Sequence, residues 1–220
     1  MPDRVSIRVP EGRTAVHAAA REDLTSTRER FLRRAAVAGG TLVVGGVVVA
    51  GLPRLASPAA QSAAGDAEIF NFALLLEYTQ AAFYAEAVDR AELSGELLEF
   101  ARVVAEHERA HVEYLRDALG GDARPEPGTD FGTATAEPEA FGAAAVTLED
   151  VAVAAYNGQA ANLTKGALRA AATIISVDAR HAAWIRSIIG ESPAEQAVDE
   201  PLSAEQATAR LEETGFLTER

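Results

Sequence analysis

The sequence predicts an all-α fold, a four-helix bundle with one long crossover and a short C-terminal helix. Four stretches of the 220 residues repeat apolar side chains at steps of three and four, which is the period of an amphipathic helix. Residues 120–146, which hold three of the nine prolines, separate the second stretch from the third. A bundle built from two helical hairpins needs one such long connection. Phe131 and Phe141 are expected to pin this crossover to the bundle surface.

The chain has a basic N-terminal part and an acidic remainder. Residues 1–65 carry 9 Arg against 5 acidic residues, whereas the remainder carries 11 basic against 28 acidic residues. A domain that acidic is a poor candidate for nucleic-acid binding, so no nucleic-acid partner is expected. The absence of Cys excludes disulfides, Cys-ligated zinc, iron–sulfur clusters and thiol catalysis.

The predicted parts follow the chain in order. A basic leader over residues 1–34 is expected to be disordered, and an apolar signal or membrane anchor covers residues 35–52. A linker of small residues spans 53–65, and the four-helix bundle spans 66–190. Residues 191–220 form a C-terminal extension, in which a capping-box signature (Ser-Ala-Glu-Gln) predicts the short helix.

The leader has the layout of an export signal. Arg-Glu-Arg-Phe-Leu-Arg-Arg (28–34) precedes the apolar run, and small residues follow it at 56–60. The basic stretch resembles a twin-arginine signal, with Glu29 in place of the second Arg. The run is close to the minimum length of a membrane span, and the positive-inside rule predicts the acidic domain outside the cytoplasm. Cleavage would give a secreted or cell-envelope protein, and retention would give a membrane-anchored one; both stay open.

The first hairpin is predicted from two stripes of apolar residues. One helix covers about residues 67–91, and Glu77 is the one carboxylate on its apolar stripe. The second covers about residues 94–119, with a serine as N-cap and two glycines as a stop signal. The inward stripe of this second helix carries Glu108 and His111.

The second hairpin follows the crossover. Its first helix is expected to begin at Thr147 as N-cap, with Glu149 in the first turn where acidic side chains favour the helix dipole, and to weaken near Gly158. The next helix covers about residues 165–189, and one of its faces carries Asp178 and His181 beside three isoleucines.

Both hairpins therefore contain a carboxylate and a histidine three residues apart on an inward face, which hints at an internal duplication. Helical bundles supply metal ligands from such pairs. The candidate metal ligands are Glu77, Glu108, His111, Asp178 and His181. The alternative is a set of buried pairs that satisfy one another without metal, Glu with His and Asp178 with Arg180.

These motifs resemble the ferritin-like domain family found in exported bacterial proteins, including desiccation-related ones. The resemblance covers about residues 68–217. It rests on the segments Leu-Glu-Tyr (76–78), Glu-His-Glu-Arg-Ala-His-Val (106–112), Phe-Gly (131–132), Leu-Glu-Asp-Val-Ala-Val-Ala-Ala-Tyr-Asn-Gly (148–158) and Asp-Ala-Arg-His-Ala-Ala (178–183).

The resemblance implies a di-metal carboxylate site, with one Glu from each of helices one and three and Glu-x-x-His from each of the other two. Four of the five candidates match this pattern, and Asp178 stands where Glu is usual. The third-helix Glu is expected to be missing, because no acidic residue lies between Asp150 and Asp178. Asn157 or Gln159 would be neutral stand-ins.

The function implied is binding of iron or manganese, with oxidation of bound Fe(II) by oxygen or peroxide if the site is active. Glu108 would bridge the two ions together with Glu77 or Asp178. The alternative is a metal-free structural or interaction domain of the cell envelope, related to stress. A homodimer is compatible with either, and membrane contact would run through residues 35–52 if they are not cleaved.

A second motif competes for the same residues. His107, Glu108 and His111 satisfy His-Glu-x-x-His, in which two histidines bind zinc and the Glu acts as general base. A protease of that kind also needs a third ligand and a substrate cleft, usually beside a sheet. His107 is expected about 60° from the inward stripe, at the flank of the bundle, because each residue of a helix turns by about 100°.

Overall fold

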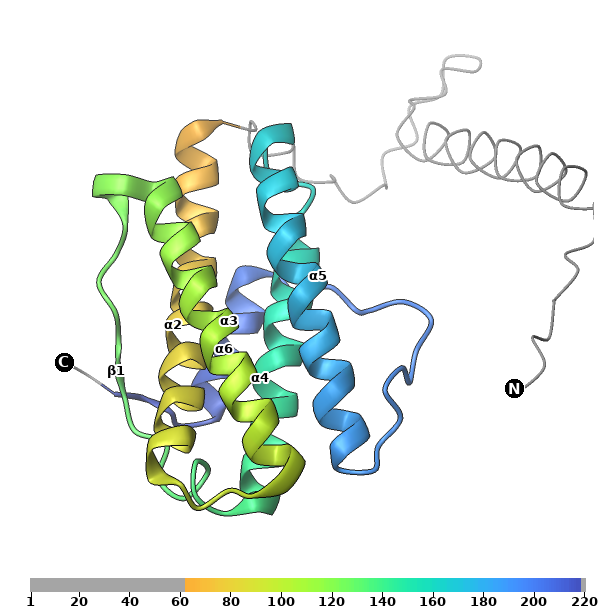
Figure 1. Ribbon diagram of the computed structural model, residues 1–220. Coiled ribbons are helices and arrows are strands. Elements are labelled where there is room, and N and C mark those ends of the chain that lie inside the picture. Colours follow the sequence, from red (N-terminus) through yellow and green to blue (C-terminus); the bar gives the residue numbers. More distant parts are fainter. Residues whose placement is uncertain (1–61, 219–220) are drawn as a thin grey trace, which may run out of the picture. The chain divides into compact units, whose positions relative to one another are not determined.

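The computed structural model describes residues 62–218 and contains two antiparallel helical hairpins (Figure 1). The crossover returns the chain to the opposite end of the bundle, so the helices run up, down, down and up. This confirms the predicted all-α bundle and its topology. The four long helices are α2 (Ala63–Arg90), α3 (Gly95–Leu119), α4 (Pro138–Gln159) and α5 (Lys165–Ile188).

Helix α2 begins earlier than the sequence pattern predicts. Ser62 is its N-cap, and the Ser62 hydroxyl accepts a hydrogen bond from the Gly65 amide at 3.1 Å. Asp66, in the first turn, accepts hydrogen bonds from the backbone amide and the hydroxyl of Thr164 at 2.8 and 2.6 Å. Because Thr164 is itself the N-cap of α5, these contacts join the starts of the two helices.

The crossover is shorter than predicted. Helix α4 begins at Pro138, a residue suited to the first turn because it needs no backbone donor there. Thr147, the predicted N-cap, lies inside the helix and donates a hydrogen bond to the Ala143 carbonyl at 3.0 Å. What remains of the crossover contains η1 (Gly120–Asp122) and β1 (Gly128–Thr129). The latter pairs antiparallel with β2 (Leu217–Thr218) near the end of the chain.

Both phenylalanines that are expected to pin the crossover to the bundle lie in the core, but Phe141 belongs to α4 and not to the crossover. Phe131 is 3% exposed, and Phe141, which belongs to α4, is fully buried. The Phe83 ring of α2 stacks on Phe141 at 5.3 Å and meets the edge of Phe131 at 5.4 Å. Contacts of this kind contribute about 0.5–1.5 kcal/mol each beyond the area they bury.

A layer of buried polar residues divides the core into two apolar parts. On one side lies an aromatic cluster around Phe83, Tyr84 and Phe100. On the other lies a mainly aliphatic cluster around Leu74, Leu115 and Ile174. Buried polar groups cost free energy unless they are hydrogen-bonded or ligate metal, so this layer needs a specific explanation.

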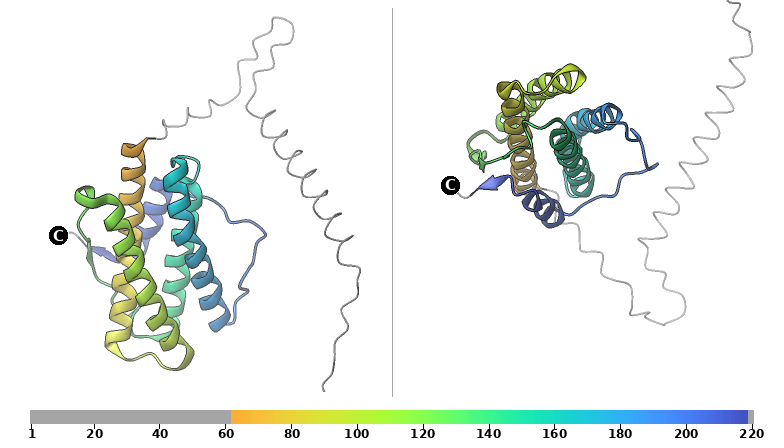
Figure 2. Two further views of the ribbon diagram at one scale, coloured as in Figure 1. Left: turned by 45° about the horizontal axis from the view of Figure 1, so that its top comes forward. Right: turned by 90° about the horizontal axis from the view of Figure 1, so that it is seen from below.

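The C-terminal extension packs against the second hairpin. Helix α6 (Ala204–Glu213) lies beside α4 (Figure 2), and Ser203 and Gln206 form the predicted capping box. The Leu202 amide donates to the Ala154 carbonyl at 3.0 Å. A Cβ at Gly158 would lie 1.8 Å from the Leu202 carbonyl oxygen, so only glycine permits this approach.

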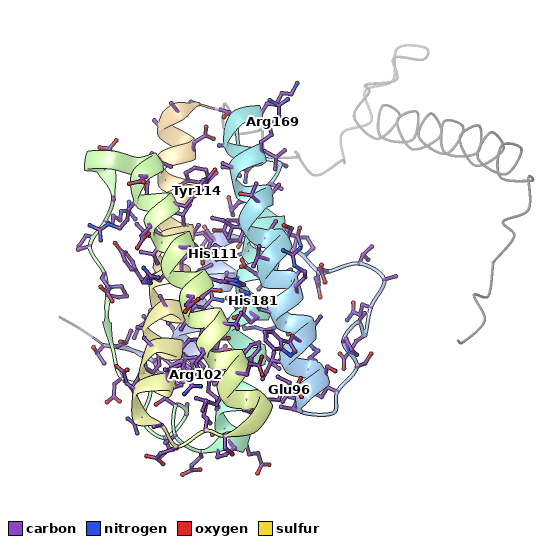
Figure 3. All side chains as sticks on the ribbon, in the orientation of Figure 1. Glu96, Arg102, His111, Tyr114, Arg169 and His181 are labelled. Carbon is purple, nitrogen blue, oxygen red and sulfur yellow. The ribbon has the colours of Figure 1, made fainter. Side chains whose placement is uncertain are left out.

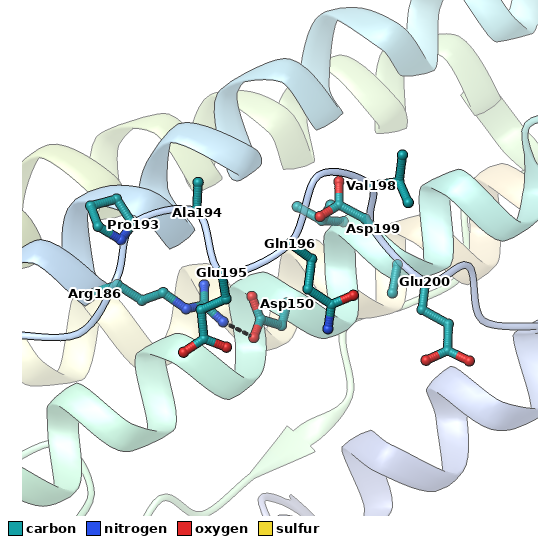
Figure 4. Close-up of a pocket in the computed structure, with 11 residues that line it drawn as sticks. Asp150, Arg186, Pro193, Ala194, Glu195, Gln196, Val198, Asp199 and Glu200 are labelled. Carbon is teal, nitrogen blue, oxygen red and sulfur yellow. Dashed lines mark hydrogen bonds and ion pairs between the residues drawn. The ribbon is translucent and has the colours of Figure 1, made fainter.

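A polar cleft of about 310 Å³ lies beneath residues 193–200, on the outside of α4 and α5 (Figure 4). Within it Arg186 reaches Asp150 and forms an ion pair. Asp150 therefore points away from the bundle interior.

Within residues 62–218, no helix combines the length and apolar character that a membrane crossing requires. The predicted leader (1–34) and the predicted signal or anchor (35–52) lie outside the described residues, as do residues 53–61 of the predicted linker; residues 63–65 belong to α2.

Candidate metal centre

The polar layer consists of six side chains from all four long helices. Figure 3 shows two of them, His111 on α3 and His181 on α5, at mid-height in the bundle. The structure brings all five sequence-predicted ligands together here and adds a sixth. The six residues are Glu77, Glu108, His111, Glu149, Asp178 and His181.

Glu149 is the residue that the sequence interpretation missed. The expectation that the third helix lacks a carboxylate is wrong, because α4 starts nine residues before the predicted N-cap. Glu149 therefore lies in the middle of the helix, and its side chain is fully buried. Asn157 and Gln159, the proposed neutral substitutes, belong to neither group of potential metal ligands in the described structure.

His111 faces carboxylates of three helices. Its Nδ1 lies 3.2 Å from Glu77 Oε2, 3.1 Å from Glu108 Oε2 and 3.5 Å from Asp178 Oδ1. One ligand atom from each of these four residues lies within 4.8 Å of the others. This spacing suits a single ion surrounded by oxygen and nitrogen donors.

His181 faces a second group. Its Nδ1 lies 3.1 Å from Glu108 Oε1 and 3.4 Å from Glu149 Oε2. One ligand atom from each of these three residues and from Asp178 lies within 4.8 Å of the others. Glu108 and Asp178 belong to both groups, so they are the two residues placed to bridge a pair of ions.

Two tyrosines form hydrogen bonds between the two helical hairpins. The Tyr84 hydroxyl of α2 donates to Glu149 Oε1 at 2.6 Å, and the Tyr156 hydroxyl of α4 donates to Glu77 Oε1 at 2.8 Å. Each tyrosine follows the glutamate of its own helix by seven residues and binds the glutamate of the other helix. Burial raises the pKa of both tyrosines well above the ordinary value, so both hydroxyls stay donors.

The metal-free cluster does not satisfy its own hydrogen bonds. Asp178 has neither carboxylate oxygen hydrogen-bonded in the described structure, and Arg180, its suggested partner, is exposed and forms no ion pair with it there. Glu108 Oε1, Glu149 Oε2 and His181 Nδ1 also lack a hydrogen bond of standard geometry there, although His181 Nδ1 lies within ion-pair distance of both carboxylates. The predicted metal-free alternative of mutually satisfied pairs is therefore only partly realised: His111 and His181 both face carboxylates, but Asp178 has no hydrogen-bond donor among the described residues.

Burial and crowding of like charges shift the pKa values in the centre. Burial, with the charge of Glu77, raises the pKa of Glu108 to about 8, and burial together with Glu77 raises that of Asp178. Burial lowers the pKa of the imidazoles, but the neighbouring carboxylates outweigh it and raise the pKa of His111 to about 10 and of His181 to about 9. At neutral pH, bound protons therefore offset much of the carboxylate charge.

His107 does not join this centre as a ligand. Its ring is exposed on α3, as its predicted position at the bundle flank requires, and its Nδ1 lies 2.9 Å from His181 Nε2. The two groups of potential ligands in the described structure omit it. The two histidines of the His-Glu-x-x-His motif thus do not converge on one ion, which removes the geometric basis of the zinc-protease interpretation.

Comparison with known proteins agrees with this architecture. No curated protein matches the chain. The family model described as a ferritin-like domain matches residues 65–191, a segment that contains α3, α4, α5, all but the first two residues of α2, and all six residues of the centre. On this match and on the bundle topology, the chain belongs to the ferritin-like domain family.

Proposed function

We propose that this protein binds a pair of iron or manganese ions in the six-residue centre. Four carboxylates and two imidazoles, with no Cys in the chain, form an oxygen-rich donor set of the kind that binds manganese and iron. The carboxylates number four and two divalent ions bring four positive charges, so the loaded centre is neutral. Bound iron or manganese would supply one-electron redox chemistry toward oxygen or peroxide.

The observation that carries the proposal is the set of buried polar atoms left without hydrogen bonds. Seven such atoms occur within residues 62–218, two of them on Gln80. The other five, on Glu108, Glu149, Asp178 and His181, are ligand-type oxygens or nitrogens, and these four residues belong to one group of potential ligands. Each such atom costs about 1–3 kcal/mol when it stays unsatisfied. A bundle that needed only stability would gain by replacing them with apolar residues.

Each residue has a definite part in holding the ions. Glu77 with His111, and Glu149 with His181, would each serve one metal position as terminal ligands. Glu108 and Asp178 would bridge the positions. Tyr84 and Tyr156 fix the terminal glutamates through one oxygen each and leave the other oxygen facing the centre.

Anaerobic titration of the full-length, metal-free protein with Fe(II) or Mn(II) tests the proposal. We expect two ions per chain in the wild type and a loss of tight binding in Glu108→Gln, because this residue serves both positions. Glu106→Gln, an exposed neighbour on the same helix, is the matched control. A folded wild-type protein that retains no metal would refute the proposal and favour a metal-free structural domain.

We also propose that the domain works outside the cytoplasm, either released or anchored through residues 35–52. The support is the order of a basic stretch, an apolar run and small residues at positions 28–60. Cell fractionation of the full-length protein, compared with a variant that carries Lys at both Val43 and Val44, tests this. Export of the variant at the wild-type level would contradict it.

A further inference from the structure

We infer that His107 is a positioning residue that fixes the ring of His181 for metal binding at one of the two positions. The inference rests on the proposed metal binding, and it assigns a role to a residue that contacts no ion. The geometry that supports it is the short contact between two imidazole nitrogens of neighbouring helices.

The two nitrogens of His181 face different partners. Nδ1 points at Glu108 and Glu149, at 3.1 and 3.4 Å, whereas Nε2 lies 2.9 Å from His107 Nδ1. A neutral imidazole has one N–H and one lone pair, and only the lone pair binds metal. A ring that ligates through Nδ1 must therefore keep its proton on Nε2, and His107 Nδ1 is placed to accept that hydrogen bond.

Ring packing adds a second constraint. The ring centroids of His107 and His181 lie 5.2 Å apart with an angle of 20° between the ring planes, so the rings are nearly coplanar, as an in-plane N–H···N hydrogen bond requires. His107 is on α3 and His181 is on α5, and the contact therefore joins the two hairpins directly. The hydrogen bond sets the tautomer of His181, and the alignment of the two rings sets the direction of its Nδ1.

The proposed metal position of His111 has no equivalent hydrogen bond to its histidine ligand within residues 62–218. His111 uses Nδ1 toward Glu77, Glu108 and Asp178, and no residue of the described structure is recorded on its Nε2. His107 immediately precedes Glu108, whereas the corresponding residue before Asp178 is Val177, which has no hydrogen-bonding side chain. The internal duplication is broken here, so the two metal positions are expected to differ in affinity.

The first test detects the hydrogen bond itself. In metal-free full-length protein labelled with ¹⁵N-histidine, a scalar coupling across the hydrogen bond should connect His181 Nε2 with His107 Nδ1. The chain has only four histidines, so the signals can be assigned by single substitutions. Absence of this coupling would overturn the inference, whether or not the protein binds metal.

The second test measures metal affinity. Mn(II) titration of His107→Phe, which keeps an aromatic ring but removes the acceptor, should show one of the two bound ions weakened about 10–100-fold. His107→Gln restores an acceptor and should recover most of the loss. Tyr114→Phe, which changes an exposed ring on the same helix, should bind both ions as the wild type does.

The outcomes separate the two claims. A wild-type protein that binds no Mn(II) would overturn the proposed function, and with it the metal-binding part of this inference. A wild-type protein that binds two ions beside a His107→Phe variant of unchanged affinity would overturn the inference alone. Equal weakening of both positions would also contradict it, because in the described structure the hydrogen bond of the His107 ring is to His181 and not to His111.

Discussion

Glu149→Gln is expected to have opposite effects on stability in the metal-free and metal-loaded protein. In the metal-free state, the Tyr84 hydroxyl can still donate to the side-chain oxygen at position 149. The new amide group replaces Glu149 Oε2, which faces His181 Nδ1 at 3.4 Å, and removes one of the four buried carboxylates crowded in the centre. Removal of a buried ionisable group from this crowded site is expected to contribute about 1–3 kcal/mol, so the metal-free variant should be the more stable protein.

In the metal-loaded state the order should reverse. An ion present at 100 times its dissociation constant stabilises the folded state by about 2.7 kcal/mol, so two ions contribute about 5 kcal/mol and one contributes half of that. For a domain of this size, each kcal/mol raises Tm by about 2–4 °C. Loading should therefore raise the Tm of the wild type by about 10–20 °C and that of Glu149→Gln by about half as much.

The assay is thermal unfolding followed by circular dichroism, with chelator and then with saturating Mn(II). Glu139→Gln, an exposed substitution on the same helix, should behave as the wild type in both conditions. Equal Tm gains in the wild type and in Glu149→Gln would refute the assignment of Glu149 as a ligand.

Three further predictions concern the metal-free protein and its pH dependence. The pKa values of His111, His181 and Glu108 (about 10, 9 and 8) all lie above their ordinary values, so their protonated forms favour the fold. Stability should fall as the pH rises from 7 to 10, while metal affinity increases because ligation displaces these protons; a flat Tm across this range would contradict it. Gln80→Met should raise the free energy of unfolding by about 1–3 kcal/mol, because both amide atoms of Gln80 are buried without a hydrogen bond in the described structure. Tyr84→Phe should lower it by about 1–3 kcal/mol, because the buried carboxylate loses its donor. Urea titration with chelator measures both, and a destabilised Gln80→Met or an unchanged Tyr84→Phe would count against the respective assignment.

Helical periodicity predicted three of the four long helices closely, since their apolar stripes contain large residues. The start of α4 has no such stripe. Residues 138–147 contain Phe141 and Val146 as the only large apolar side chains among small ones, and Pro138 looked like a loop residue although proline also begins helices. The helical structure of this alanine-rich segment can be recognised only from its tertiary packing, such as the contact of Phe141 with Phe83.

The error in the helix start caused the error in the site. A glutamate in a first turn is explained by the helix dipole, whereas the same glutamate in mid-helix and buried needs a ligand or a partner. One sequence signal could have found Glu149. Tyr156 follows it by seven residues, as Tyr84 follows Glu77, so both helices repeat the same two-turn spacing. The cross-helix bonds from each tyrosine to the opposite glutamate could be seen only in three dimensions.

The duplicated pattern explains why the polar layer lies where it does, and its one asymmetry indicates how the two positions differ. Carboxylates, imidazoles and tyrosines recur in both hairpins, so each apolar cluster ends against the same kind of polar residue. Only the first hairpin has a histidine, His107, directly before its proposed bridging carboxylate, Glu108. The His107 ring contacts His181, the proposed histidine ligand from the second hairpin. Because His107 constrains His181 and no described residue constrains the ring of His111 in the same way, we expect the order of metal loading to depend on a residue outside the ligand set, with the position of His181 filling first.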